Sequence, residues 1–273
     1  MKKENKKHSL LRPKKSLGQN FLIDENIARK IVAALEITPS DAVLEIGPGR
    51  GVLTKYLVES AGKLLAVEID RALVAQLSER FGEAENFRLL NEDVLKLDLT
   101  SVLNSRHRWK VIGNVPYHIT SQIFFKLFEH REKISTAVFM IQREVADRMA
   151  AAPNCKDYGI LAVFCQFYAE VEKLFHVSRH VFAPKPDVTS AVIRLKMRQH
   201  LPIAGTELKI FTEIVKRGFG QRRKMLRNSL QKTTDLSVDW DKIDFNFERR
   251  PEQLRVEEFV ALAQQIAQKQ IRS

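Results

Sequence analysis

The residues of this chain best suited to chemistry form the short run Asn114-Val115-Pro116-Tyr117, which follows the apolar pair Val111-Ile112. An aromatic amine is a poor nucleophile because its lone pair is delocalised into the ring. The side-chain carbonyl of Asn114 and the backbone carbonyl of Pro116 could each accept one amine hydrogen, which frees the lone pair for in-line attack on an activated methyl group. Tyr117 offers a flat face on which a base can stack. The run therefore predicts group transfer to the amine of a base; the plainer alternative is an ordinary turn.

A second candidate site combines glycines with two acidic residues. Gly47, Gly49 and Gly51 lie between a predicted strand and a predicted helix, where glycine permits a sharp turn and close approach of a ligand to the backbone. Their spacing is not that of the dinucleotide fingerprint, and no P-loop sequence occurs. Glu68 and Asp93 lie near the ends of the next two predicted strands, where carboxylates can bind ribose hydroxyls and an adenine amine. Together they predict a nucleoside site; the alternative is a tight turn beside two solvated acids.

These residues need a frame that brings the ends of several strands together. Short apolar runs predict strands at 42–46, 64–69, 87–90, 111–112, 137–141 and 192–195. Apolar residues at helical spacing predict helices around 24–35, 52–57 and 73–81. Such alternation is typical of a parallel sheet covered by helices. Residues 207–273 show helical patterns alone, so we expect a domain boundary near 198–206.

Charge and cysteine content narrow the class of protein further. The 273 residues carry a formal net charge of +12, and most of it lies in residues 1–20 and 208–232. Two basic clusters on an otherwise balanced chain favour a surface that binds the phosphates of nucleic acid, and two solvated basic faces are the alternative. Two cysteines, Cys155 and Cys165, argue against a disulfide framework and a multi-cysteine zinc site, and favour a reduced, intracellular compartment. We expect no export signal or membrane span, since no apolar run is long enough.

Five further blocks of sequence accompany the Asn114–Tyr117 loop. They are Gln19-Asn20-Phe21-Leu22, Glu45-Ile46-Gly47-Pro48-Gly49, Glu68-Ile69-Asp70, the stretch from Phe182 to Ala191, and Arg222-Arg223-Lys224-Met225-Leu226-Arg227-Asn228. With these blocks the chain resembles, from about residue 12 to 270, the bacterial small-subunit (16S) ribosomal RNA adenine dimethyltransferases. Val115, where the family usually has Leu or Ile, and Arg50 in the glycine loop are mild departures from the pattern.

The resemblance implies a fold, a domain organisation and a set of site residues. The fold is α/β, a Rossmann-like sheet of S-adenosylmethionine-dependent methyltransferases with helices on both faces and a small all-α C-terminal domain. The implied parts are a basic flexible tail (1–16), a methyltransferase domain (17–200) and a helical RNA-binding domain (201–273). The implied cofactor-binding residues are Asn20, Leu22, Gly47, Glu68, Asp93 and Asn114. Phe182 joins Asn114, Pro116 and Tyr117 in the catalytic set, as a second aromatic ring against an extruded adenine; a core phenylalanine is the alternative.

The implied reaction transfers methyl groups from S-adenosylmethionine to the exocyclic amines of two adjacent adenines near the 3′ end of 16S rRNA, giving N(6)-dimethyladenosines during small-subunit biogenesis. The expected partner is 16S rRNA in the assembling small subunit, bound by Arg222, Arg223, Lys224 and Arg227, with no metal and no membrane. We expect a cytoplasmic monomer. Two alternatives stay open, a large-subunit rRNA adenine methyltransferase that shares the loop and a non-catalytic RNA-binding assembly factor that keeps the fold.

Overall fold

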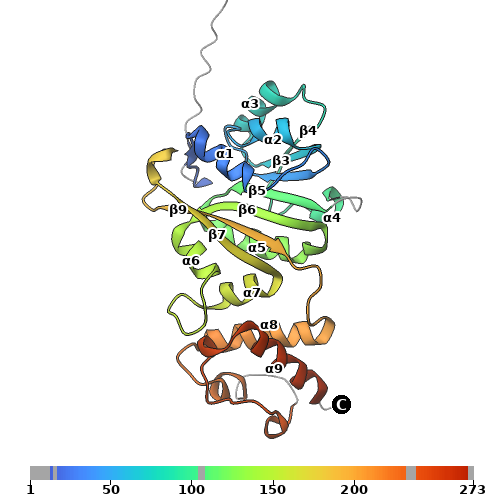
Figure 1. The fold of residues 1–273 in the computed structure, drawn as a ribbon, viewed down its shortest axis with the longest axis vertical. Coiled ribbons are helices and arrows are strands. Elements are labelled where there is room, and N and C mark those ends of the chain that lie inside the picture. The colour runs from blue at the N-terminus through green and yellow to red at the C-terminus, as the bar shows by residue number, and fades with distance from the viewer. Residues whose placement is uncertain (1–12, 15–16, 104–107, 232–237, 270–273) are drawn as a thin grey trace, which may run out of the picture. The chain divides into compact units, whose positions relative to one another are not determined.

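The largest element of the fold is a seven-stranded sheet in the order β4-β3-β2-β5-β6-β9-β7 (Figure 1). The computed structural model describes residues 13–14, 17–103, 108–231 and 238–269, so most of the predicted tail lies outside the described residues. The strands of the sheet are β2 (Ala42–Ile46), β3 (Lys63–Glu68), β4 (Phe87–Asn91), β5 (Trp109–Asn114), β6 (Ile134–Gln142), β7 (Ala169–Val177) and β9 (Ser190–Met197). A second, two-stranded sheet pairs β1 (Phe21–Leu22) with β8 (Phe182–Ala183). The predicted Rossmann-like α/β fold is confirmed.

The strands β4, β3, β2, β5 and β6 run parallel, which brings their carboxyl ends to one edge. All five residues of β2 are buried, as expected for a strand with both faces covered. The register pairs Ile46 with Val67 on one side and with Gly113 on the other. Open sheets of this kind bind ligands beyond the carboxyl ends of their strands. The predicted chemical residues therefore follow strands that end at the ligand-binding edge.

Several helices of this part begin at aspartates, whose carboxylates cap the first turn. Asp24 caps α1 (Glu25–Ala33) by accepting hydrogen bonds from the backbone N–H groups of Asn26 and Ile27, and Asp70 caps α3 (Arg71–Phe81) by accepting one from the N–H of Ala72. The remaining helices are α2 (Thr54–Ser60), α4 (Leu99–Val102), the 3₁₀ turn η2 (Tyr117–Ile119) and α5 (Thr120–Glu129). The predicted helices around 24–35, 52–57 and 73–81 are thus present. Within the described ranges, no helix is both long and apolar enough to cross a membrane.

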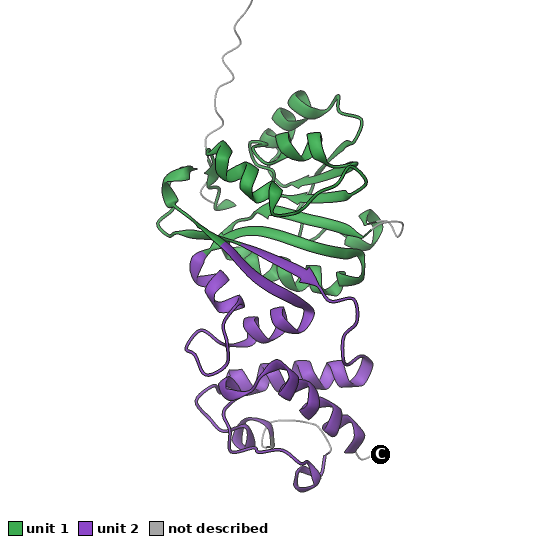
Figure 2. Cartoon of the chain, in the orientation of Figure 1, with its two compact units in different colours: residues 1–142, 175–192 green, residues 143–174, 193–273 purple. Residues whose placement is uncertain are grey.

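The chain forms two compact units, residues 1–142 with 175–192 and residues 143–174 with 193–273 (Figure 2). The second unit contains α6 (Arg143–Met149), α7 (Ile160–Tyr168), α8 (Gly205–Gly220) and α9 (Val256–Lys269). These bounds differ from the predicted division near 198–206. The difference arises because α7 packs on α8: the ring of Phe167 stacks on Phe211 with centroids 4.3 Å apart. Residues upstream of the predicted boundary therefore share a core with the C-terminal helices.

The strand β7 has no counterpart among the predicted strands. Its two ends, Ala169 and Val177, are buried, but the residues between them alternate irregularly between exposed and half-buried. Glu170, Glu172 and Lys173 interrupt the apolar pattern. A strand that lacks both a continuous apolar run and a clean alternation gives no periodic signal in the sequence.

Candidate active site

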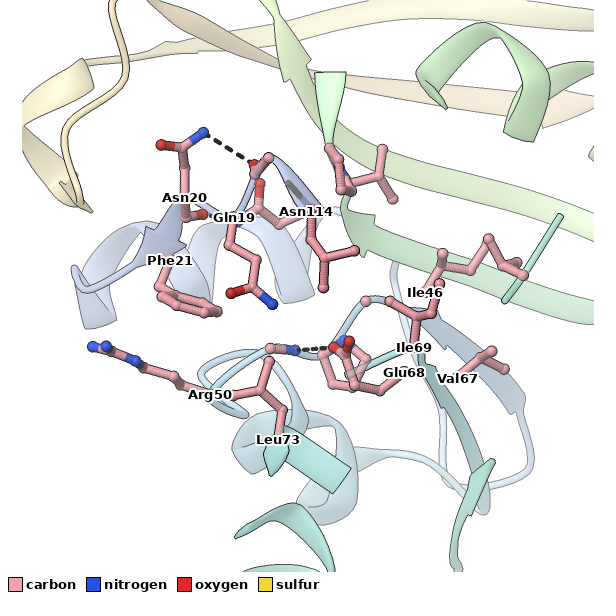
Figure 3. A pocket seen from close by; sticks show the side chains of 18 of the residues that line it. Gln19, Asn20, Phe21, Ile46, Arg50, Val67, Glu68, Ile69, Leu73 and Asn114 are labelled. Atoms are coloured by element: carbon pink, nitrogen blue, oxygen red, sulfur yellow. Dashed lines mark hydrogen bonds between the residues drawn. The ribbon is translucent and has the colours of Figure 1, made fainter. Parts of the chain in front are cut away.

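A pocket lies at the carboxyl edge of the sheet in the first unit (Figure 3). Its lining combines residues 17–22, residues 46–50 and residues at or just after the ends of β3, β4 and β5. Every predicted catalytic and cofactor-binding residue except Phe182 lines it, namely Asn20, Leu22, Gly47, Glu68, Asp93, Asn114, Pro116 and Tyr117. The fold therefore brings both predicted sites, the nucleoside site and the amine-orienting loop, into one pocket.

The loop after β2 requires glycine where it borders this pocket. Gly49 has a φ of +58°, in the left-handed region that other residues rarely adopt. A Cβ atom at this position would also lie 3.1 Å from Cδ1 of Phe21, which is tighter than most Cβ contacts in proteins. The backbone of the loop is consequently bare on this side, while the N–H groups of Gly47 and Gly49 donate to the carbonyl of Val67 at 2.9 Å and to the carboxylate of Glu68 at 3.1 Å.

Glu68 presents an oriented, largely buried carboxylate to the pocket. Its Oε2 accepts a hydrogen bond from the backbone N–H of Gly49 at 3.1 Å, and its Oε1 accepts one from the N–H of Asp70 at 2.9 Å. Burial raises the pKa of Glu68, and these backbone hydrogen bonds oppose that shift. A carboxylate has about four lone-pair sites, so Glu68 keeps capacity to accept a hydrogen bond from a hydroxyl group of a ligand.

The side chain of Asn114 is held in one orientation at the end of β5. Its Nδ2 donates a hydrogen bond to the backbone oxygen of Asn20 at 3.2 Å. Because a backbone carbonyl oxygen can only accept, the amide nitrogen must point to Asn20 and Oδ1 must point the other way. Asn114 itself lines the pocket, so the geometry leaves its side-chain oxygen as an acceptor for a ligand amine.

The backbone carbonyl of Pro116 has a different environment from the one predicted. It accepts a hydrogen bond from the N–H of Ile119 at 3.3 Å and another from the hydroxyl of Thr120 at 3.4 Å. Both bonds belong to the turn η2 and use the two lone pairs of the oxygen. Val115 also lines the pocket and precedes this turn. The carbonyl of Val115 is therefore the better candidate for a second amine acceptor, and Pro116 acts by shaping the turn.

Tyr117 has a fixed ring orientation. Its hydroxyl forms a hydrogen bond of 2.9 Å with the hydroxyl of Ser190, a fully buried residue at the start of β9. Burial raises the pKa of Tyr117, so the phenol remains protonated and available as a donor at neutral pH. Ser190 belongs to one of the sequence blocks, but nothing in the sequence assigns it this partner. The ring lines the pocket, where it offers a flat face.

Phe182, by contrast, does not line the pocket. It lies in β8, where it pairs with Leu22 of β1, and its side chain is 4% exposed. In this arrangement it has the environment of a core phenylalanine, the alternative reading of its block. To stack on a base opposite Tyr117, Phe182 would first have to leave this packing.

Comparison with known proteins agrees with the pocket. The family model described as ribosomal RNA adenine dimethylase matches residues 11–268. The chain belongs to this family. It is 44% identical over 257 residues to the ribosomal RNA small subunit methyltransferase A of Bacteroides thetaiotaomicron, which covers 94% of this chain and 95% of the relative. It is 42% identical over 262 residues to the protein of the same name from Geobacillus thermodenitrificans, covering 92% of this chain and 89% of the relative.

Two solved structures share the fold over most of the chain. A dimethyladenosine transferase from Plasmodium falciparum aligns with a TM-score of 0.76 and 26% identity, covering 89% of this chain and 95% of that one. The 23S rRNA methyltransferase ErmE aligns with a TM-score of 0.70 and 28% identity, covering 91% of this chain and 100% of that one. The fold is thus shared with a dimethyladenosine transferase and with a 23S rRNA methyltransferase. The higher identity to the small-subunit relatives favours the main prediction over the large-subunit alternative, and the predicted methyltransferase activity is confirmed.

The pocket of this rRNA adenine dimethylase suits S-adenosylmethionine, the methyl donor of the enzyme class. Asp93 has its Oδ1 oriented by the backbone N–H of Leu95 at 2.9 Å, next to the glycine loop and Glu68 in the same lining. Ile69 is 48% exposed and lines the pocket, so it provides an apolar surface for a flat ring. Bare backbone, two oriented carboxylates and an apolar wall match the hydroxyl, amine and ring surfaces of a nucleoside.

The predicted RNA-binding residues lie in the second unit, and one of them, Arg222, has three hydrogen-bond partners there. Arg222 donates from Nε to the carboxylate of Glu252 at 2.6 Å, and from its two terminal nitrogens to the backbone oxygens of Lys156 at 2.6 Å and Cys155 at 3.0 Å. Through these three hydrogen bonds, Arg222 connects its own segment to residues 155–156 and to Glu252. Arg223 and Lys224, in contrast, are exposed. The predicted phosphate contacts therefore divide into one structural residue and two solvent-facing ones.

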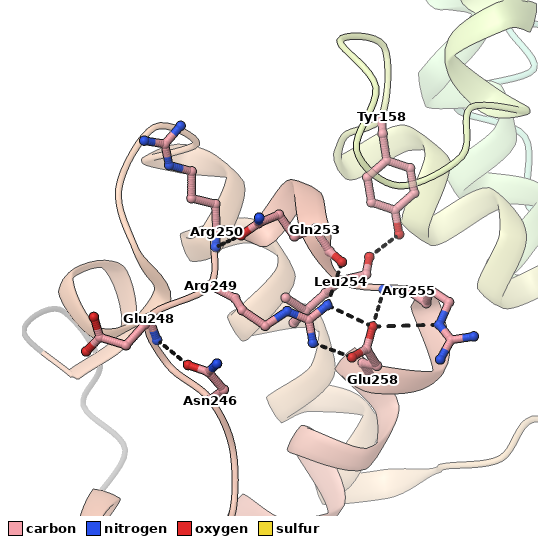
Figure 4. A network of polar contacts seen from close by, with 9 residues as sticks. All are labelled: Tyr158, Asn246, Glu248, Arg249, Arg250, Gln253, Leu254, Arg255 and Glu258. Atoms are coloured by element: carbon pink, nitrogen blue, oxygen red, sulfur yellow. Dashed lines mark hydrogen bonds and ion pairs between the residues drawn. The ribbon is translucent and has the colours of Figure 1, made fainter.

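The fourth predicted residue, Arg227, is exposed and lies 3.5 Å from the carboxylate of Glu248. Its own backbone N–H donates to the carbonyl of Phe247 at 3.0 Å, which anchors the loop. Figure 4 shows a polar network in the same unit, in which Arg249 forms an ion pair with Glu258 at the first turn of α9. The N–H of Leu226 donates to the carbonyl of Arg249 at 2.9 Å, which ties the segment that carries Arg227 to this network.

Proposed function

We propose that this chain transfers methyl groups from S-adenosylmethionine to the exocyclic amines of two adjacent adenines near the 3′ end of 16S rRNA, within an assembling small ribosomal subunit. The observation that carries the proposal is the orientation of Asn114, whose amide nitrogen is bound to the Asn20 carbonyl at 3.2 Å. The names of the relatives supply the subunit. We further propose that the protein acts in the cytoplasm as a monomer.

The proposed mechanism starts from the two acceptors at the end of β5. Oδ1 of Asn114 accepts one hydrogen of the adenine amine, and a backbone carbonyl of the loop, that of Val115 rather than Pro116, accepts the other. These bonds draw the nitrogen towards tetrahedral geometry and release its lone pair from the ring. When bound, S-adenosylmethionine supplies an electrophilic methyl group. The methylated nitrogen is cationic and acidic, so its proton leaves to water and no strong base is needed at position 114.

Tyr117 and the cofactor residues orient the two reactants. The ring of Tyr117, fixed by Ser190, provides the stacking face for the extruded adenine. Phe182 is proposed as the opposing ring, and this role requires it to leave the β1–β8 packing when RNA binds. Glu68 binds the ribose of the methyl donor and Asp93 its adenine amine, while Asn20, Leu22 and Gly47 contact the remainder. Positioning the reactants in this way supplies much of the rate enhancement in group transfer.

In the second unit, we propose that Arg223, Lys224 and Arg227 contact phosphates of the rRNA. All three are exposed: Arg223 and Lys224 follow α8, and Arg227 begins the π-helical turn η5 (Arg227–Gln231). Arginine can bind a phosphate through two N–H groups, and lysine acts as a point charge. Arg222 supports these residues by holding the loop rather than by binding RNA.

The test is transfer of labelled methyl groups from S-adenosylmethionine to under-methylated small subunits, followed by mapping of the modified nucleosides. We expect label in dimethyladenosine near the 3′ end of 16S rRNA. Label in large-subunit rRNA under the same conditions would establish the large-subunit alternative. Binding of the subunit with no transfer to either rRNA, beside an active control enzyme, would establish a non-catalytic assembly factor.

A further inference from the structure

Large apolar side chains are exposed around the pocket of the first unit. Within the described ranges this unit exposes three of them, Ile23 at 53%, Ile69 at 48% and Val188 at 42%. Ile69 lines the pocket and faces the methyl donor, whereas Ile23 and Val188 are not among the lining residues. Single exposed apolar residues are ordinary on a protein surface, but several around one pocket indicate a surface that a ligand covers.

The pairing of β1 with β8 fixes Ile23 at the border of the pocket. Ile23 directly follows Leu22, which lines the pocket and pairs with Phe182. The N–H of Ile23 donates to the carbonyl of Val181 at 2.8 Å, which continues this pairing by one residue. In Figure 1 the yellow segment that precedes β9 accordingly lies beside the blue N-terminal part of the chain. Residues 181–183 therefore run along the pocket wall that β1 forms.

Val188 lies at the other end of the same stretch, next to the proposed stacking face. It precedes Ser190 by two residues, and the hydroxyl of Ser190 bonds to that of Tyr117 at 2.9 Å. Two residues of chain span at most about 7 Å, so the Cα of Val188 lies within this distance of the Cα of Ser190. The stretch from 181 to 190 thus borders the pocket from β1 to the ring of Tyr117.

Two exposed cations belong to this stretch or adjoin it. Arg179 begins the 3₁₀ turn η4 (Arg179–Val181), whose last residue bonds to Ile23. Lys185 lies two residues beyond the end of β8 (Phe182–Ala183). Both side chains are exposed, and Asp187 is the one acidic residue between positions 178 and 190. Cations beside exposed apolar side chains match the two chemical surfaces of a nucleotide, its phosphate and its base.

We propose that Ile23, Val188, Arg179 and Lys185 form a rim that binds the rRNA nucleotides directly next to the target adenine. Ile23 and Val188 cover the ring of the neighbouring base, and Arg179 and Lys185 contact the phosphates on either side of it. The inference rests on the proposed function and deepens it by naming the surface that holds the RNA around the extruded base.

Extrusion of the target base explains why such a surface is needed. The amine of the target adenine reaches Oδ1 of Asn114 only after the base has left its stack, and unstacking costs free energy. Extrusion also uncovers one ring face of the neighbouring base, which is the second adenine because the two target adenines are adjacent. Apolar side chains that cover this face recover part of the cost, and phosphate contacts fix the position of the strand.

The experiment measures kcat and KM for transfer to under-methylated small subunits, and the Kd for a protein-free 3′-terminal fragment of 16S rRNA. Ile23→Thr and Val188→Thr keep a β-branched side chain while they remove apolar surface. Each should raise KM and Kd about fivefold, which is the effect of burying roughly half of such a side chain, and leave kcat at saturating subunits unchanged. Val188→Ile keeps the apolar surface and should retain the wild-type values.

The two cations are tested by the salt dependence of binding to the same fragment. Arg179→Gln and Lys185→Gln should each lower the slope of log K against log salt by about 0.7, the value for one phosphate of a single strand. The threonine variants should leave this slope unchanged. Arg88→Gln is the matched control, because Arg88 is exposed near the amino end of β4, at the opposite end of that strand from the pocket. It should change neither the slope nor KM.

Three results would overturn the inference. The first is an unchanged Kd and KM in both threonine variants. The second is a loss of affinity for intact subunits but not for the protein-free fragment, since a ribosomal protein would then be the partner. The third is a fall in kcat together with Tm, which would show that these residues support the fold. If wild-type protein methylated no adenine of the small subunit, the proposed function would fail, while the Kd values for the fragment would still decide whether the rim binds RNA.

Discussion

Arg222 and Arg223 are adjacent in sequence, yet the structure predicts opposite consequences for their substitution by glutamine. Arg222 has three internal acceptors, the Glu252 carboxylate and the carbonyls of Cys155 and Lys156. Arg223 is exposed and has solvent around it. Loss of Arg222 should therefore reduce folding stability, whereas loss of Arg223 should reduce the salt dependence of RNA binding.

The expected sizes follow from the contacts. Hydrogen bonds from a charged donor contribute about 1.5–3 kcal/mol each when buried. The side chain of Arg222 is 36% exposed, so solvent screening reduces the total for its three bonds to about 2 kcal/mol. For a chain of this size that corresponds to a fall in Tm of roughly 4–8 °C. Removing one phosphate contact lowers the slope of log K against log salt by about 0.7–0.9. When salt rises from 50 to 200 mM, the affinity of Arg223→Gln for RNA should thus fall by a factor roughly three times smaller than the factor for wild type.

Differential scanning fluorimetry and filter binding over a salt series test both expectations on the same preparations. Arg222→Gln should lower Tm with little change in the salt slope. Arg223→Gln should lower the salt slope with little change in Tm. Lys224→Gln is the matched control for a second exposed charge and should behave like Arg223→Gln. The reasoning would be refuted if Arg222→Gln reduced the slope by about one with an unchanged Tm, because its guanidinium would then bind phosphate rather than the protein.

Three other predictions test the first unit. Asn114→Ala should reduce methyl transfer at least a hundredfold, which is the usual effect of losing one oriented group that stabilises a transition state. The Kd for RNA should stay within a few-fold of the wild-type value. An equal loss of transfer and of RNA binding would contradict the role assigned to Asn114. Burial raises the pKa of Glu45 to about 8 from 4.5. Between these pH values the folded state retains a proton that the unfolded state has lost. The free energy of unfolding therefore falls by up to about 1.4 kcal/mol per pH unit as pH rises through this range. The Tm of Glu45→Gln should therefore rise relative to the Tm of wild type between pH 6 and pH 9. A difference between the two Tm values that does not change with pH would refute a raised pKa. Tyr117→Phe and Ser190→Ala remove the same hydrogen bond, so each should lower kcat by a similar factor, with no further loss in the double variant; independent effects would show that Ser190 does not orient the ring.

Local pattern was sufficient for most of the first unit. The strand predicted at 42–46 is present with those bounds, since five consecutive apolar or buried residues end at a glycine turn. The helix predicted from Asp24 begins there because its carboxylate caps the first turn. The family resemblance and the positions of residues at the ends of predicted strands together identified eight of the residues that line the pocket. The strand β7 was missed because charged residues interrupt its apolar pattern.

The amino-acid sequence by itself determined the α/β class, the family and the residue types gathered at the strand ends, because periodicity, turn-forming glycines and short motifs are local properties of the chain. Only the tertiary structure decided which of those groups are free to react. The carbonyl of Pro116 is used by its own turn, Arg222 is bound by three partners of its unit, and Phe182 is packed in β8. Conversely, Asp70 acquires Lys14 and Gln19, more than 50 positions away, as partners. The partner of a hydrogen-bonding group is the donor or acceptor that lies within about 3 Å of it in the folded protein. For these groups, long-range packing decides which partner that is.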